Sequence, residues 1–131
     1  METLTLKTRI SVLWIFMAVA MSAHSVLSFM EPGMVEKIIA GEMAMGPEMM
    51  LFMAILWWVP LVMAVLSVTL KDSANRWANM ILGIVFTVLS IGHLTEHLAH
   101  PSAHQLLIVA STIVVAALIF WFALKWPKQK A

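Results

Sequence analysis

The chain consists of four long runs of apolar residues separated by short polar breaks. The runs extend from about 10 to 30, from 48 to 70, from 76 to 100 and from 103 to 126. Each can cross a bilayer, since about 20 helical residues at 1.5 Å per residue span the ~30 Å hydrocarbon core. In lipid such a run must be helical, because its backbone groups find no water to pair with. The pattern predicts an all-α fold, a four-helix transmembrane bundle that forms a single domain over residues 1–131.

The polar breaks contain residues that end and begin helices. Glu-Pro-Gly at 31–33 stops the first run, and Gly-Pro at 46–47 introduces the second. Pro101 ends the third run, because proline removes a helical hydrogen bond and disfavours the helical conformation of the residue before it. Ser102 and Gln105 have the spacing of a capping box for the fourth helix, with Gln105 reaching back to the Ser102 amide.

The one long connection, residues 31–47, has apolar residues on one helical face and Glu36 and Lys37 on the other. This pattern predicts a short interfacial helix on the outer membrane surface. The segment is also rich in methionine, and two interpretations stay open for Met43, Met45 and the neighbouring pair at 49–50. They are thioether ligands for Cu(I), or they fill apolar gaps in an interfacial linker.

Composition agrees with a membrane environment. Hydrophobic residues make up 62% of the chain and charged residues 11%, against roughly 25% charged in a soluble domain. The absence of cysteine excludes disulfides, thiolate ligands and covalently attached c-type haem. The expected partners are the lipid bilayer and either a second copy of the chain or a membrane complex, and no nucleic acid.

The basic residues predict the orientation. Seven of the eight fall on one side of a four-span topology: Lys7, Arg9, Lys71, Arg76, Lys125, Lys128 and Lys130. Only Lys37 falls on the other side, so the positive-inside rule predicts that both termini are cytoplasmic. The alternative is a cleaved signal peptide, since basic residues precede the first apolar run and Ala-Val-Ala at 18–20 resembles a cleavage site.

All five histidines lie toward the opposite, outer side, and the third run carries a stripe of small and polar residues that leads to them. The stripe comprises Asn79, Gly83, Thr87, Ser90, His93, His97 and His100. Small and polar residues in a membrane helix face other helices, so the stripe is expected to face the bundle. His93 and His97 are one turn apart on it, and imidazoles at i and i+4 can hold one metal ion.

The candidate ligands of such a site are His93, His97 and Glu96, with His24, His100 or His104 assisting. His24 lies at a similar depth in the first run, so it completes a site with His93 or His97 if the first and third helices are neighbours. The metal that this donor set predicts is Zn or Cu.

Other interpretations of the cluster stay open. They are a hydrogen-bonded structural patch near the interface, a proton relay or transport site, and a bis-histidine b-type haem. His93 to His97 also matches the H-x-x-E-H pattern of one class of metalloprotease. Nothing else in the sequence assembles a nucleophile, a base and an oxyanion donor, so no catalytic residue and no enzymatic activity is predicted.

Three segments resemble a family of small four-helix bacterial membrane proteins of unassigned function. They are Ser-Phe-Met-Glu-Pro-Gly at 28–33, Gly-Glu-Met at 41–43 and Ala-Asn-Arg-Trp-Ala-Asn at 74–79. The resemblance covers most of the first three helices. It implies the four-span fold and residence in a bacterial or archaeal inner membrane, and it transfers no binding or catalytic residue.

The resulting function hypothesis is a small polytopic integral membrane protein that binds a transition-metal ion through the outer histidine and glutamate cluster. A small proton-coupled transporter is one alternative, which requires a water-filled path across the bilayer. An accessory or packing subunit of a membrane complex is the other, which requires an apolar lateral face for its partner.

Overall fold

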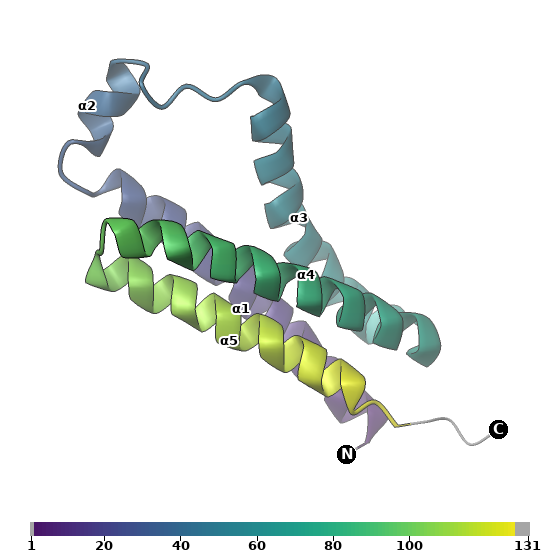
Figure 1. Ribbon diagram of the computed structural model, residues 1–131. Helices are drawn as coiled ribbons and strands as arrows, with labels where there is room; N and C mark the ends of the chain where they lie inside the picture. The colour runs from purple at the N-terminus through teal and green to yellow at the C-terminus, as the bar shows by residue number, and fades with distance from the viewer. Residues whose placement is uncertain (1, 128–131) are drawn as a thin grey trace.

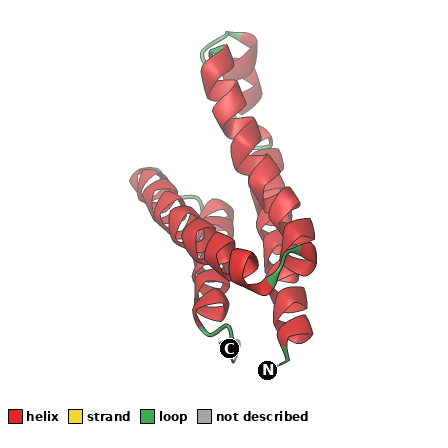
Figure 2. Cartoon of the chain, turned by 90° about the vertical axis from the view of Figure 1, so that its right-hand side faces the viewer, coloured by secondary structure: helices red, strands yellow, loops and turns green. Residues whose placement is uncertain are grey.

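The computed structural model describes residues 2–127 and, within them, consists of helices without a strand (Figures 1 and 2). The helices are α1 (Thr3–Phe29), α2 (Met34–Ile39), α3 (Pro47–Thr69), α4 (Asp72–Ala99) and α5 (Ala103–Leu124). All except α2 are long and apolar enough to cross a membrane. The predictions of an all-α fold and of four candidate spanning helices are therefore confirmed, and the chain has the features of a multi-pass membrane protein.

Two helices begin earlier than their apolar runs. α1 starts at Thr3 and not near residue 10, and α4 starts at Asp72 and not at residue 76. The added turns carry Lys7 and Asp72, whose Nζ and Oδ1 atoms lie 2.8 Å apart. Lys7 also donates to the carbonyl oxygen of Leu70 at 2.9 Å, just before α4. Hydropathy alone misses these turns because charged and polar side chains among their residues lower the mean hydropathy.

The helices are arranged so that α1 and α4 lie across the diagonal of the bundle. α4 packs mainly on α5, α1 packs on α3 and α5, and α3 meets α4 only over a small area. The start of α1 and the end of α5 lie at the same end of the bundle, here called the terminal end (Figure 1). The opposite end carries α2 and is called the α2 end. Lys128 and Lys130, which contribute to the predicted orientation, lie outside the described residues.

The tightest packing is in the half of the bundle toward the terminal end. Trp14 of α1 is fully buried and meets the edge of Phe86 of α4, with ring centroids 5.4 Å apart and ring planes at 86°. The buried cluster around them comprises Leu6, Ile10, Met17, Met63, Ala64, Val115, Ala116, Ile119 and Trp126. The diagonal helices are thus joined through large side chains, because their backbones do not approach each other closely.

A buried polar network ties this core together. Trp14 donates its indole N–H to Oδ1 of Asn79 at 2.6 Å, and Asn79 donates in turn to Oδ1 of Asn75 at 2.7 Å. Asn75 donates to the carbonyl oxygen of Ser67 on α3 at 2.7 Å. In a low-dielectric interior an unpaired polar group is costly, so these bonds stabilise the inward orientation of Asn75 and Asn79.

Near its middle α3 changes direction (Figure 1). Pro60 lies inside this helix and is buried. Proline removes one backbone hydrogen bond and clashes with the preceding turn, which kinks a helix. Before the bend, all residues of α3 from 47 to 55 are exposed. This half of α3 therefore does not cover the bundle at the level of the histidines of α1 and α4.

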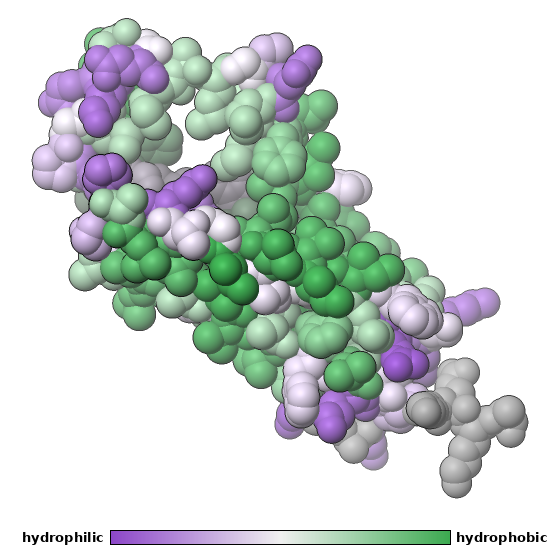
Figure 3. All heavy atoms as spheres, in the orientation of Figure 1, coloured by the Kyte–Doolittle hydropathy of each residue, from purple (hydrophilic) through white to green (hydrophobic). Residues whose placement is uncertain are grey.

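Hydropathy is distributed in a band on the visible face of the molecule. Apolar residues cover its middle, and hydrophilic residues gather at the terminal end and around α2 (Figure 3). This distribution is what a bilayer requires, with an apolar zone between two polar boundaries. It agrees with a lipid environment for the four long helices.

Candidate metal centre

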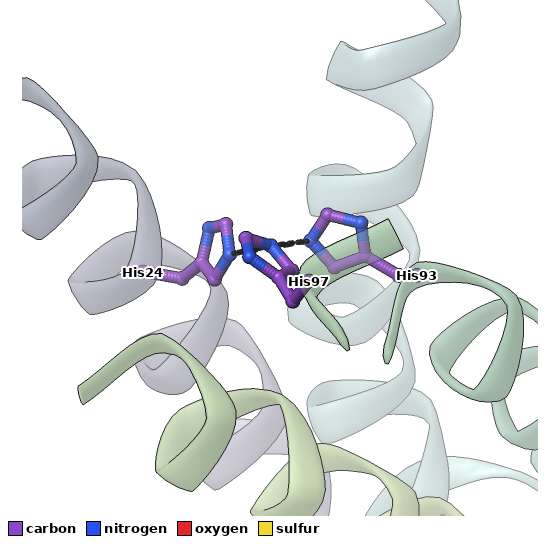
Figure 4. Close-up of side chains that lie close together, drawn as sticks. All are labelled: His24, His93 and His97. Carbon is purple, nitrogen blue, oxygen red and sulfur yellow. Dashed lines mark hydrogen bonds between the residues drawn. The ribbon is translucent and has the colours of Figure 1, made fainter. Parts of the chain in front are cut away.

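Three histidines from two helices converge at the α2 end of the bundle (Figure 4). The Nε2 atom of His24, on α1, lies 2.9 Å from that of His97 and 3.2 Å from that of His93, both on α4. The Nε2 atoms of His93 and His97 are 3.2 Å apart. The ring centroids are farther apart, at 4.6 to 4.9 Å, so the rings point their Nε2 edges toward a common centre. We call His24, His93 and His97 the triad.

Hydrogen bonds alone cannot satisfy this arrangement. Each ring nitrogen of a neutral imidazole is either a donor or an acceptor. Of three nitrogens at least two must be of the same kind, so hydrogen bonds can join at most two of the three pairs. The remaining pair would face each other as two lone pairs or as two N–H groups, at about the 3 Å that separates all three atoms. A cation bound by three lone pairs removes this conflict.

The spacing of the nitrogens fits one transition-metal ion. With metal–nitrogen bonds of about 2.0–2.1 Å, tetrahedral geometry places ligand nitrogens about 3.3–3.4 Å apart, and octahedral geometry about 2.9 Å. The observed separations of 2.9, 3.2 and 3.2 Å lie at and between these values. The triad therefore has the geometry of a facial set of three ligands, and its donors are the imidazole nitrogens that Zn and Cu accept.

A carboxylate supports one member of the triad. Oε2 of Glu96 lies 3.4 Å from Nδ1 of His93, the ring nitrogen that faces away from the triad. A carboxylate at this position favours a proton on Nδ1 and leaves the lone pair on Nε2 for a metal. Glu96 is thus placed to orient His93 and lies outside the group of atoms that converge on the centre.

The backbone that carries His24 is held by Gln105 of α5, which is 1% exposed. Nε2 of Gln105 lies 3.4 Å from the carbonyl oxygen of His24 and 2.8 Å from Oγ of Ser28, and Ser28 donates to the same carbonyl at 2.9 Å. The predicted capping box is therefore wrong, and Ser102 makes no side-chain cap at the start of α5. The reason is that Gln105 faces the bundle interior and pairs with α1 instead of with its own helix terminus.

The other predicted ligands lie elsewhere. His100 follows the last residue of α4 and is exposed. His104 pairs with Glu31, with Nε2 and Oε1 3.2 Å apart, and its ring also lies beside Oγ of Ser102. The methionines considered as Cu(I) ligands, Met43, Met45, Met49 and Met50, are all exposed on the α2–α3 connection and the first turn of α3.

Sequence reasoning missed the supporting role of Gln105 and its link to Glu31, whose Oε1 lies 3.4 Å from Nε2 of Gln105. A signal was present. Gln105 is the only amide side chain in the fourth apolar run, residues 103–126. A lone amide in a membrane helix needs a partner on another helix.

Fold and site together define a class of protein. It is a four-helix membrane protein in which two diagonal helices present a three-histidine cluster near one end of the bundle. Over residues 4–131 the chain matches the model of a protein family described as a family of unknown function (DUF6326), and it belongs to that family. No curated protein and no solved structure matches the chain.

Proposed function

We propose that this protein binds one transition-metal ion, Zn(II) or Cu(II), through the Nε2 atoms of His24, His93 and His97. The observation that supports the proposal is the convergence of three Nε2 atoms within 3.2 Å of one another. Neutral imidazole suits both metals, and the chain offers no thiolate that would favour a softer site. A bis-histidine haem fits less well, because three nitrogens at this spacing leave no room for a macrocycle between two axial ligands.

The proposed location of the site is the outer face of a bacterial or archaeal inner membrane, with both termini in the cytoplasm. The excess of basic residues near the terminal end supports this orientation. In this position the triad would take its metal from outside the cell or from the periplasm. The short helix α2, with its exposed apolar side chains Val35, Ile38 and Ile39, would lie in the outer interface.

A metal site is favoured over a proton-coupled transporter. A relay across the bilayer needs ionisable groups at successive depths. The sequence has none between Arg9 and His24 in α1, and none between Arg76 and His93 in α4. Large apolar side chains such as Met17 and Phe86 fill the space between these levels. The ionisable groups therefore form two separate zones and no chain.

Elemental analysis tests the proposal. The protein, purified in detergent with a tag that contains no histidine, is equilibrated with Zn(II), desalted and measured for zinc per chain. Wild type is expected to retain close to one zinc, and His24→Ala or His97→Ala to lose it, because two imidazoles alone hold the ion weakly. His100→Ala and His104→Ala are matched controls that remove the same side chain from the same end of the molecule and should retain the zinc.

Two results would contradict the proposal. One is a wild-type protein that retains neither zinc nor, after the same treatment with Cu(II), copper. The other is a His24→Ala variant that retains as much metal as wild type. Circular dichroism and gel filtration of each variant show whether loss of metal accompanies loss of fold.

A further inference from the structure

We infer that the metal ion held by the triad keeps a coordination position open, and that this position takes a small exchangeable ligand. Water would occupy it at rest, and a small monodentate anion would replace the water. The inference rests on the proposed metal site and goes beyond it. A site with an open position can exchange a ligand, whereas a structural zinc site is closed by four protein ligands.

The first support is the spacing of the three nitrogens. An ion lying in their plane, bonded at about 2.0–2.1 Å, would hold them about 3.5 Å apart. The observed separations, 2.9 to 3.2 Å, are all shorter. An ion at that bond length would therefore lie about 1 Å out of the plane of the nitrogens. The hemisphere on the far side of the ion is then free of triad ligands, with one position in tetrahedral and three in octahedral geometry.

The second support is the set of neighbouring donors. Within residues 2–127, the group of histidine and carboxylate atoms that converge on the centre contains the triad alone. Glu96 contacts His93 at Nδ1, the nitrogen directed away from the centre. Glu31 is engaged by His104 and by Gln105. The nearby carboxylates therefore have other partners, and the open hemisphere receives no histidine or carboxylate ligand from this part of the chain.

The third support is access. The side chain of His93 is 45% exposed, and His24 and His97 are only partly buried. The outer half of α3, whose residues 47–55 are all exposed, does not cover the site. A closed four-helix bundle would shield this level, and the bend at Pro60 prevents it. A small ligand can therefore reach the ion without a rearrangement of the helices.

The charge of the site defines the class of ligand. Three neutral imidazoles leave the double positive charge of the ion uncompensated, and the nearest carboxylates are engaged with histidines. An anion is therefore favoured over a neutral molecule. The exchange is a ligand substitution in which the bond from the ion to water breaks, a bond to the anion forms and water is released. No electron is transferred, and no co-reactant is required.

The test uses the full-length protein loaded with Co(II), an ion that resembles Zn(II) in geometry and has visible d–d absorption. Unbound cobalt is removed by desalting, and sodium azide is titrated in. The expected result is a saturable change in the d–d bands that corresponds to one azide per cobalt, with the cobalt still bound after a second desalting step. His100→Ala is the matched control and should titrate in the same way, whereas His97→Ala should retain no cobalt to titrate.

The outcomes separate this inference from the proposed function. Retained cobalt with a spectrum that azide does not change would overturn the inference and leave the metal site intact. A spectral change on adding azide that occurs in His100→Ala but not in wild type would also overturn the inference, because His100 of a second copy would then close the wild-type site. Loss of cobalt on adding azide would likewise overturn the inference, because azide would then displace the imidazoles and not the water at an open position. Failure of wild type to retain any metal would overturn both proposals.

Discussion

At the scale of residues, what distinguishes the triad is the direction of its rings. Histidines near a helix end in a membrane protein often hydrogen-bond to water or headgroups through one nitrogen each. Here the three Nε2 atoms face one another at 2.9 to 3.2 Å, while the Nδ1 atom of His93 faces Glu96. The same tautomer, with the proton on Nδ1, therefore satisfies both the metal and the carboxylate.

Replacing Glu96 should weaken metal binding without abolishing it. Glu96→Gln removes the charge that favours the ligating tautomer of His93, and loss of such a supporting group costs 10–100-fold in affinity. Because Oε2 lies 3.4 Å away and the side chain is 79% exposed, we expect a rise in Kd at the lower end, about 10-fold. Competition for zinc with a chromophoric chelator measures this Kd. Glu36→Gln, an equal change on exposed α2, is the control, and an equal effect in both variants would contradict the role of Glu96.

At the scale of elements, one helix serves two environments. The α4 stripe is fully buried at Asn79 and Gly83, partly buried at Thr87 and Ser90, and exposed at His93. The inner part packs on α5 so closely that a Cβ atom added at Gly83 would lie 2.9 Å from the backbone nitrogen of Phe120. The outer part is open because the first half of α3 does not cover it. Packing on α5 thus fixes the position of α4, and His93 and His97 lie at the uncovered end of this helix.

A methyl group on α4 should have opposite effects at its two glycines. At Gly83 it would meet backbone atoms of α5 that cannot move aside, so Gly83→Ala should destabilise the fold by about 1–3 kcal/mol. At Gly92, the residue directly before His93, nothing lies within 4 Å. Gly92→Ala should leave stability unchanged or raise it by up to about 1 kcal/mol, since alanine is the better helix former.

Unfolding of both variants by denaturant in the same detergent measures the difference. Equal stability of Gly83→Ala and wild type would contradict the close packing of α4 on α5.

At the scale of the whole molecule, the number of helices and their approximate limits followed from the sequence because a bilayer demands long apolar helices. The resemblance to an uncharacterised family was likewise confirmed. The candidate ligands could be named because His93 and His97 share one helical face. Which of the remaining histidines joins them could not be predicted, since His24 lies across the diagonal from α4 and hydropathy carries no information on helix order.

The same limit explains the error at Gln105. Its spacing from Ser102 fits a capping box. Its side chain instead contacts Ser28 of α1, which is 77 residues away in the sequence. Local patterns describe contacts within a helix. The contacts that assemble this site run between helices. The bend of α3, by contrast, has a local cause, because Pro60 removes a backbone hydrogen bond within its own helix.

The orientation of the molecule is open to direct labelling, because the chain contains no cysteine. Single cysteines are introduced by Glu42→Cys in the α2–α3 connection and by Ser73→Cys at the start of α4, both at exposed positions. A membrane-impermeant maleimide should label Glu42→Cys in intact spheroplasts and Ser73→Cys only after permeabilisation, as the positive-inside rule predicts. The reverse pattern would place the triad on the cytoplasmic side.

Coordination of one ion by three imidazoles can be measured by X-ray absorption at the zinc edge of the loaded protein. We predict three histidine rings with zinc–nitrogen distances of about 2.0–2.1 Å, together with an oxygen or nitrogen from a small ligand. In any zinc that His24→Ala retains, the number of rings should fall to two. A spectrum with fewer than three rings in wild type, or one that His24→Ala leaves unchanged, would contradict the account.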